Sequence, residues 1–208
     1  MNAGAPAAAE TVRPSKTLAQ FLSLLFSRPS AELVDLGPVI GSNIAFFGER
    51  IGCKIHVEDL YADLDRHARE DALDELPKFL GRRFALPDAT VDAVLCWDVV
   101  DYLAPAAAGV LAGELTRMLR PGGALLGFFS GDGADDRGYT KYVIEDESHL
   151  RGRLYAGACC RGRALQNREI TDLFAGLDLF GSVLLKSGVR EALFRKPGPT
   201  PPCASERR

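Results

Sequence analysis

Residues 33–41, with the sequence LVDLGPVIG, combine the residue types that hold a nucleotide-like ligand. A short apolar run containing Asp35 leads into Gly37 and Gly41, which predicts a buried parallel strand that turns sharply toward a helix. Doubly wound α/β proteins hold adenosine-containing ligands at such turns. Val39 departs from the pattern, because it replaces a middle glycine and a β-branched residue is costly at positive φ. Either the loop follows an ordinary backbone path that leaves room for a ligand, or Val39 occupies the volume that the ligand needs.

The elements around this loop alternate between strand and helix. A helix is predicted from Gly41 to about Arg50, because Ile44, Phe47 and Ile51 share one face, and Gly52 is expected to cap it. Strands are predicted at 31–35, 54–58, 91–97 and 124–129, and two more at 179–186 and 191–194 are joined by Ser187 and Gly188. Further helices are predicted at 17–26, at 61–83 with a break before Pro77, and at 106–119. A last helix begins at its cap, Asn167, and runs to Phe174.

Two further segments connect these elements. Residues 120–123, RPGG, end a helix and turn the chain into the next strand, since proline and two glycines prevent the helix from continuing. Residues 131–137 form a polar, glycine-rich loop at the end of that strand. A third strand before residue 91 is poorly supported: its best candidate, residues 83–86, is short and weak. We therefore expect that strand to be missing or vestigial.

Length and composition indicate one globular domain. We expect this domain at residues 17–196, with a disordered leader at 1–16 and a proline-rich disordered tail at 197–208. A formal net charge of −3 gives no basic surplus for bulk nucleic-acid binding, and no apolar segment is long enough to span a bilayer. The oligomeric state is left open.

The cysteines and histidines give little indication of chemistry. The five cysteines are odd in number and show no Cys-x-x-Cys spacing, so we expect reduced thiols and a cytoplasmic location. The adjacent Cys159 and Cys160 would suit redox chemistry, but half-buried neighbours are the commoner arrangement. The three histidines are too scattered in sequence to indicate a metal site, and none is assigned.

From residue 31 to residue 196, the order of elements resembles the class I S-adenosylmethionine-dependent methyltransferases, within them the type 11-like domain, with a divergent glycine motif. Val34-Asp35-Leu36-Gly37 followed by Gly41 is similar to the first motif of that family. Residues 86–95, LPDATVDAVL, resemble the entry to its fourth strand, and residues 115–123, LTRMLRPGG, resemble its helix-to-fifth-strand junction. The resemblance implies a doubly wound, mostly parallel sheet with helices on both faces and an antiparallel C-terminal hairpin.

The resemblance also implies a site for S-adenosylmethionine. The backbone at the two glycines would line the cofactor, Asp35 would steady the loop or the ammonium group of the ligand, and Glu58 would accept both ribose hydroxyls, with Asp59 as the alternative. The residues after the fourth strand would meet the methionine part, although core packing explains Trp97 equally well. The implied cofactor contacts are Asp35, Gly37, Gly41, Glu58, Cys96, Trp97 and Asp98.

Two features of the family have no counterpart in this sequence. The acidic residue that meets the adenine amino group would fall near Arg82 or Arg83, so no adenine acceptor is assigned. No catalytic base stands out either, and methyl transfer from a sulfonium needs one only when the acceptor must lose a proton. Several side chains near the expected mouth of the site are interpreted as structural or substrate-lining: Asp98, Asp101, Tyr102, Tyr139 and Tyr142.

Three functions compete at this stage. The first is methyl transfer to a small molecule or a protein side chain. The second is a binding protein that kept the methyltransferase fold and lost the chemistry, which Val39 and the missing adenine acceptor favour. The third, a nicotinamide-dependent oxidoreductase, ranks below both, because Asn43 replaces its usual third glycine and no Tyr-x-x-x-Lys pair follows in a suitable helix.

Overall fold

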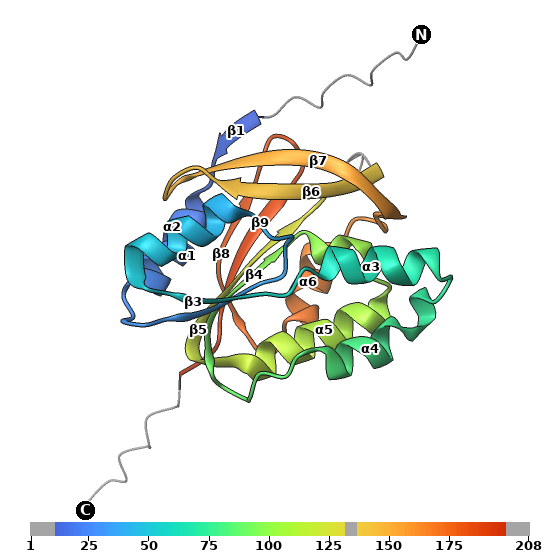
Figure 1. Ribbon diagram of the computed structural model, residues 1–208, viewed down its shortest axis with the longest axis horizontal. Coiled ribbons are helices and arrows are strands. Elements are labelled where there is room, and N and C mark those ends of the chain that lie inside the picture. Colours follow the sequence, from blue (N-terminus) through green and yellow to red (C-terminus); the bar gives the residue numbers. More distant parts are fainter. Residues whose placement is uncertain (1–10, 132–136, 199–208) are drawn as a thin grey trace, which may run out of the picture.

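The computed structural model describes residues 11–131 and 137–198 (Figure 1). Its larger sheet has six strands: four are parallel neighbours, the fifth runs antiparallel to them, and the sixth runs antiparallel to the fifth. In spatial order these strands are β3 (Lys54–Val57), β2 (Glu32–Asp35), β4 (Val91–Trp97), β5 (Leu119–Phe129), β9 (Arg190–Arg195) and β8 (Asp178–Leu184). The mostly parallel sheet and the C-terminal hairpin of β8 and β9 confirm the predicted fold class.

Helices cover both faces of this sheet, as Figure 1 shows. Alternate residues of a strand point to opposite faces, so Leu33 packs with α1 and α2, whereas Val34 packs on the other side. On the first face lie α1 (Lys16–Phe26) and α2 (Gly41–Ile51), and on the second lie α3 (Leu60–Arg69), α4 (Leu76–Arg83), α5 (Pro105–Met118) and α6 (Asn167–Leu173). The sheet is therefore doubly wound around two apolar layers.

Local signals explain where several of these elements end. α2 ends at Gly52, which takes the left-handed conformation with φ of 55°. α5 gives way directly to β5, and the RPGG junction lies inside β5, where the pairing with β4 shifts register. A Cβ at Gly123 would lie 2.8 Å from the carbonyl oxygen of Arg120, so only glycine fits this turn.

A second, three-stranded antiparallel sheet was not predicted from the sequence. It consists of β1 (Thr11–Pro14), β7 (His149–Cys160) and β6 (Arg137–Ile144), in that order, and lies across the larger sheet in Figure 1. The side chain of Asn43 on α2 ties β6 down, because its Nδ2 donates to the carbonyl of Tyr142 and its Oδ1 accepts from the amide of Ile144, both at 2.9 Å. Residues 11–14, which were expected to belong to a disordered leader, form β1, and Lys16 begins α1.

The region between β3 and β4 agrees with the predictions. The helical segment expected at 61–83, with a break before Pro77, is divided into α3 and α4 by a short 3-10 helix, η1 (Leu73–Glu75), and Pro77 lies in the first turn of α4, where its missing N–H costs nothing. Residues 84–90 form no strand, and the described sheet ends at β3, so the third strand is missing as expected.

A few other expectations change in detail or lie outside the described residues. Gln166, not Asn167, caps α6, and it forms a capping box with Glu169. Residues 1–10, residues 132–136 of the polar loop and residues 199–208 of the tail are not described. Within the described part, no helix is long and apolar enough to cross a membrane.

Candidate functional site

The sequence-predicted site residues meet at the carboxyl ends of three neighbouring strands. Glu58 follows β3, the loop from Gly37 to Gly41 follows β2, and Asp98 follows β4. The chain leaves β2 toward β3 on one side and returns to β4 on the other side, so the strand order reverses at this point. Doubly wound sheets bind ligands at such a reversal.

Asp35 holds the loop after β2 in place. Its Oδ1 accepts from the amide of Gly37 at 2.9 Å and from the indole Nε1 of Trp97 at 2.6 Å. Burial away from any cation raises the pKa of this carboxyl group to about 6. A Cβ at Gly37 would lie 2.8 Å from the same indole nitrogen, so glycine is what allows the ring this close to the loop. Of the two roles expected for Asp35, the structure shows the steadying of the loop.

Val39 does not enter the protein interior. Its φ is not positive and its side chain is 65% exposed, so the loop takes the ordinary backbone path. Gly41 begins α2, and a Cβ there would have no heavy atom within 4 Å. The space beside Gly41 is thus open, and Val39, which replaces the middle glycine of the motif, does not fill it.

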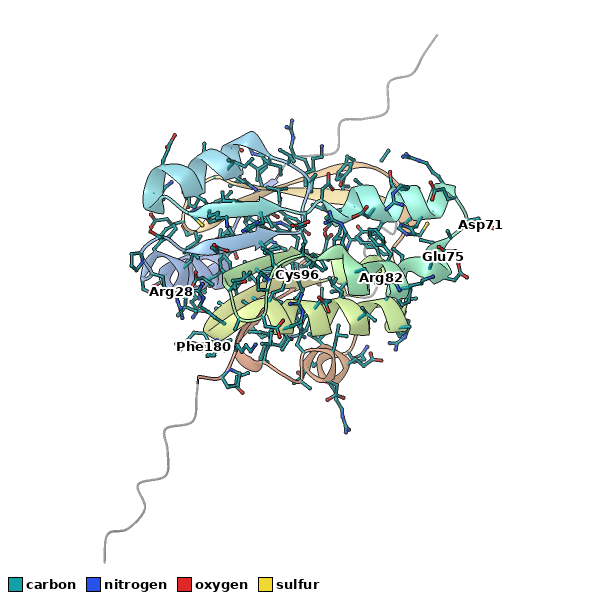
Figure 2. All side chains as sticks on the ribbon, turned by 60° about the horizontal axis from the view of Figure 1, so that its bottom comes forward. Arg28, Asp71, Glu75, Arg82, Cys96 and Phe180 are labelled. Carbon is teal, nitrogen blue, oxygen red and sulfur yellow. The ribbon has the colours of Figure 1, made fainter. Side chains whose placement is uncertain are left out.

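The two residues that end β4 point to opposite faces. Trp97 is buried and stacks on Tyr142 of β6, with ring centroids 5.2 Å apart and an angle of 9° between the planes. Its φ of 51° is unusual for a bulky residue, and strained backbone of this kind gathers at functional sites. Cys96 lies in the interior among the helices of the second face, as Figure 2 shows, and burial raises its pKa. The thiol of Cys96 therefore faces away from the loop.

The carboxylate of Glu58 is held by an arginine. Nη1 of Arg83 lies 2.5 Å from Oε2 of Glu58, Nη2 donates to the Glu58 carbonyl at 2.8 Å, and Nε donates to Asp63 at 2.9 Å. The neighbouring Asp59 caps α3 by accepting from the amide of Ala62, so it is occupied. Between the two acidic candidates, Glu58 is the one at the strand end with a side chain that caps no helix.

Asp98 belongs to a buried charge network that the sequence did not indicate. It accepts from Oη of Tyr61 and from Nη2 of Arg161, each at 2.5 Å. Nη1 of Arg161 also donates to Asp101 at 2.7 Å and to Ser130 Oγ at 2.6 Å. Arg161 follows β7, far from β4 in sequence, and no local motif marks it. Burial raises the pKa of Asp101 to about 6 in spite of this cation.

All five tyrosines of the chain gather around the ends of these strands. Tyr61 packs against Tyr102 and Tyr139, with ring centroids 5.9 and 5.0 Å apart, and Tyr139 packs against Tyr155. Burial raises the pKa of each of them, so the phenols stay neutral. They form a largely apolar wall, of which Tyr61, Tyr102, Tyr139 and Tyr142 are buried.

The described residues offer no metal centre. No group of three or more His, Cys, Asp or Glu side chains in this part of the chain is arranged to hold a metal ion. Cys53, Cys96, Cys159 and Cys160 are free thiols.

Comparisons with known proteins agree with the overall fold. Residues 34–127 match the family model described as a methyltransferase domain. A putative sarcosine dimethylglycine methyltransferase from Galdieria sulphuraria has a similar fold, with a TM-score of 0.53 at 13% identity over 86% of this chain and 84% of that chain. N-methyltransferase NodS from Bradyrhizobium japonicum WM9, solved with S-adenosylhomocysteine, gives a TM-score of 0.51 at 17% identity over 86% and 85%. No curated protein matches the sequence.

Proposed function

We propose that this chain is a class I S-adenosylmethionine-dependent methyltransferase, and that it transfers a methyl group from S-adenosylmethionine to a small molecule or a protein side chain. The main support is the placement of the Gly37 loop, Glu58 and Asp98 on adjacent strand ends at the reversal point of the sheet. All three lie inside the segment that matches the methyltransferase domain.

The role of each residue follows from its position. Glu58 accepts the ribose hydroxyls, and Arg83 keeps its carboxylate at the strand end. An ionised carboxylate offers about four acceptor positions, so the pairing with Arg83 leaves some for a diol. The backbone at Gly37 and Gly41 lies against the cofactor, and the carboxylate of Asp35 fixes that loop.

When bound, S-adenosylmethionine supplies a methyl group that its sulfonium already activates. The chain then has to position the acceptor in line and exclude water, which accounts for a large share of the rate. Asp98 and Asp101 are oriented by Arg161, and the tyrosine wall stays neutral. These residues position the acceptor, and no base is assigned among them.

Binding of S-adenosylhomocysteine tests the site directly. We expect micromolar affinity by calorimetry and a change in the fluorescence of Trp97, the single tryptophan. Glu58→Gln should weaken binding about tenfold or more, because hydrogen bonds to a charged acceptor contribute about 1.5–3 kcal/mol. Glu32→Gln is the matched control, since Glu32 begins β2 at its other end and pairs with Lys54 at 3.2 Å.

If S-adenosylhomocysteine does not bind at millimolar concentration, the proposal is wrong. Transfer is tested by incubating the protein and labelled S-adenosylmethionine with a cell extract, where labelled product is the expected result. Tight binding without any labelled product would favour the hypothesis of a binding protein that lost the chemistry. NAD should leave the Trp97 signal unchanged, as expected for a site that is not a nicotinamide site.

A further inference from the structure

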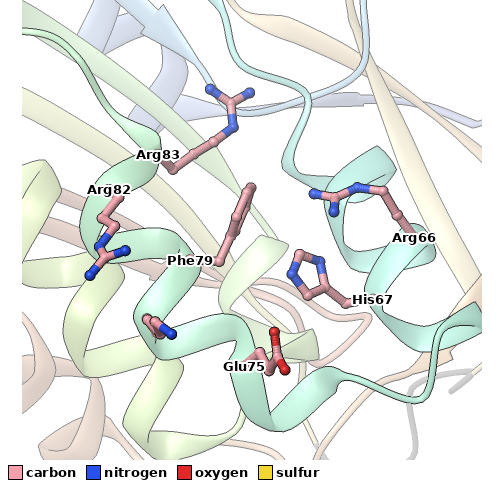
Figure 3. A pocket seen from close by; sticks show the side chains of 7 residues that line it. Arg66, His67, Glu75, Phe79, Arg82 and Arg83 are labelled. Carbon is pink, nitrogen blue, oxygen red and sulfur yellow. The ribbon is translucent and has the colours of Figure 1, made fainter.

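A groove of about 470 Å³ lies between α3 and α4, outside the site described above. Figure 3 shows that side chains from both helices face one another across it. Arg83 stands at one end of the groove, so the groove adjoins the position of Glu58 but does not include the loop after β2. Its volume is that of a small-molecule pocket.

Four cationic side chains line the groove: Arg66, Lys78, Arg82 and Arg83. Two of them are paired with carboxylates, because Asp63 accepts from Arg66 and from Arg83, each at 2.9 Å, and Glu58 accepts from Arg83 as well. Lys78 and Arg82 lie one turn apart on α4, are exposed, and have no ion pair or hydrogen bond with any described residue. Glu75 is the single acidic side chain in the lining. The uncompensated positive charge of the groove therefore comes from Lys78 and Arg82, with Glu75 as the opposing charge in the lining.

The groove also offers a fixed aromatic surface. Phe79 is half-buried, with the His67 ring 4.8 Å away and the Arg66 guanidinium 5.1 Å from its centroid. Nδ1 of His67 lies 2.7 Å from the carbonyl oxygen of Asp63, and since a carbonyl only accepts, this nitrogen carries the proton. The ring of Phe79 is thus held from two sides while part of its surface remains open to the groove.

We propose that this groove binds a small phosphate monoester that carries a flat ring. Its phosphate meets Lys78 and Arg82, because a dianion matches two unpaired cations where a carboxylate would match one. Its ring lies against Phe79. The site adjoins the one proposed for S-adenosylmethionine and shares Arg83 with it, but the inference does not depend on methyl transfer.

Titration of the full chain with phenyl phosphate, by calorimetry and by backbone amide shifts, tests the proposal. We expect binding at α3 and α4 that is several-fold tighter than that of inorganic phosphate, which lacks the ring, or of benzoate, which carries one charge. Replacing both cations, Lys78→Gln with Arg82→Gln, should weaken phenyl phosphate binding about tenfold, because both exposed charge pairs with the phosphate are lost. Glu75→Gln should instead tighten it about twofold to fivefold, since a like charge is removed.

The matched control is the double variant Lys186→Gln with Arg168→Gln, which makes the same charge change at exposed positions away from the groove. It should leave the affinity within about twofold of the starting protein. Equal losses in the two double variants would show a general charge effect and overturn the proposal. No binding, or amide shifts confined to another surface, would overturn it as well.

Discussion

Asp35 and Asp101 are both buried carboxyl groups, but their partners differ. Asp101 has the guanidinium of Arg161 within 2.7 Å, whereas among the described residues Asp35 accepts only from the N–H groups of Gly37 and Trp97. Burial without a cation is costly for the ionised form, and it raises the Asp35 pKa from 3.8 to about 6. The residue that fixes the loop after β2 therefore makes the fold sensitive to pH.

The sign of that sensitivity can be predicted. A carboxyl group with a raised folded pKa stabilises the fold fully below its unfolded pKa, and this stability is lost as the pH rises through the folded value. Asp35→Asn stays neutral, so the wild-type free energy of unfolding should fall relative to the variant by up to about 3 kcal/mol between pH 4 and pH 7. Urea denaturation of the wild type and the variant across this pH range measures the difference. Asp101 titrates in both proteins, so its contribution cancels. Parallel curves for the two proteins would contradict the role given to Asp35.

At the scale of single elements, the β2–α2 connection has room for a side chain at one of its two glycines and not at the other. Neither Gly37 nor Gly41 has a positive φ, so the contrast does not come from backbone strain. A Cβ at Gly37 would meet the Trp97 indole and the Asp35 carboxylate within 3.1 Å, whereas one at Gly41 would meet nothing within 4 Å.

Alanine at these two positions should therefore have opposite consequences. Gly37→Ala should lower the free energy of unfolding by about 2 kcal/mol, as overpacking of a buried site does, and should shift the Trp97 emission. Gly41→Ala should be neutral or stabilising by up to about 1 kcal/mol, because alanine favours the helix. Denaturant melts followed by fluorescence compare the two. Equal destabilisation by both would mean that the loop needs glycine for another reason.

Element prediction succeeded where local patterns are strong. The apolar run of β4, the helical stripe of α2 closed by Gly52, and the hairpin of β8 and β9 can all be read from a few neighbouring residues. β6 and β7 were missed because β7 buries few side chains, mainly Leu150 and Cys159, so its hydrophobic alternation is weak. Pairing with β1 and cover of the larger sheet stabilise it instead.

At the scale of the whole molecule, Arg161 connects the two sheets. It follows β7 of the smaller sheet and neutralises Asp98 and Asp101 at the end of β4 in the larger one. Removing the single cation from a buried network leaves uncompensated carboxylates, which typically costs about 3–5 kcal/mol.

Arg161→Gln should accordingly lower the free energy of unfolding by about 3 kcal/mol, measured by urea denaturation. Adding Asp98→Asn should recover part of the loss, because one of the unpaired charges disappears. The neighbouring Arg163 is 68% exposed and pairs with Glu169, so Arg163→Gln serves as the control and should keep the unfolding midpoint. If both arginine variants behaved alike, the buried network would not hold the sheets together.

The sequence alone was enough to assign the ends of the parallel strands, and with them the loop at Gly37 and the carboxylate of Glu58. These positions follow from patterns a few residues long, and parallel strands bring their carboxyl ends to one edge. The partners of those residues required the fold. Arg83 reaches Glu58 across 25 residues, Arg161 reaches Asp98 across 63, and Asn43 reaches Tyr142 across 99. The outward direction of the Val39 side chain could not be predicted from the local sequence either, because the same residues are compatible with both backbone paths. Such contacts depend on how the layers pack, and packing is a property of the whole chain.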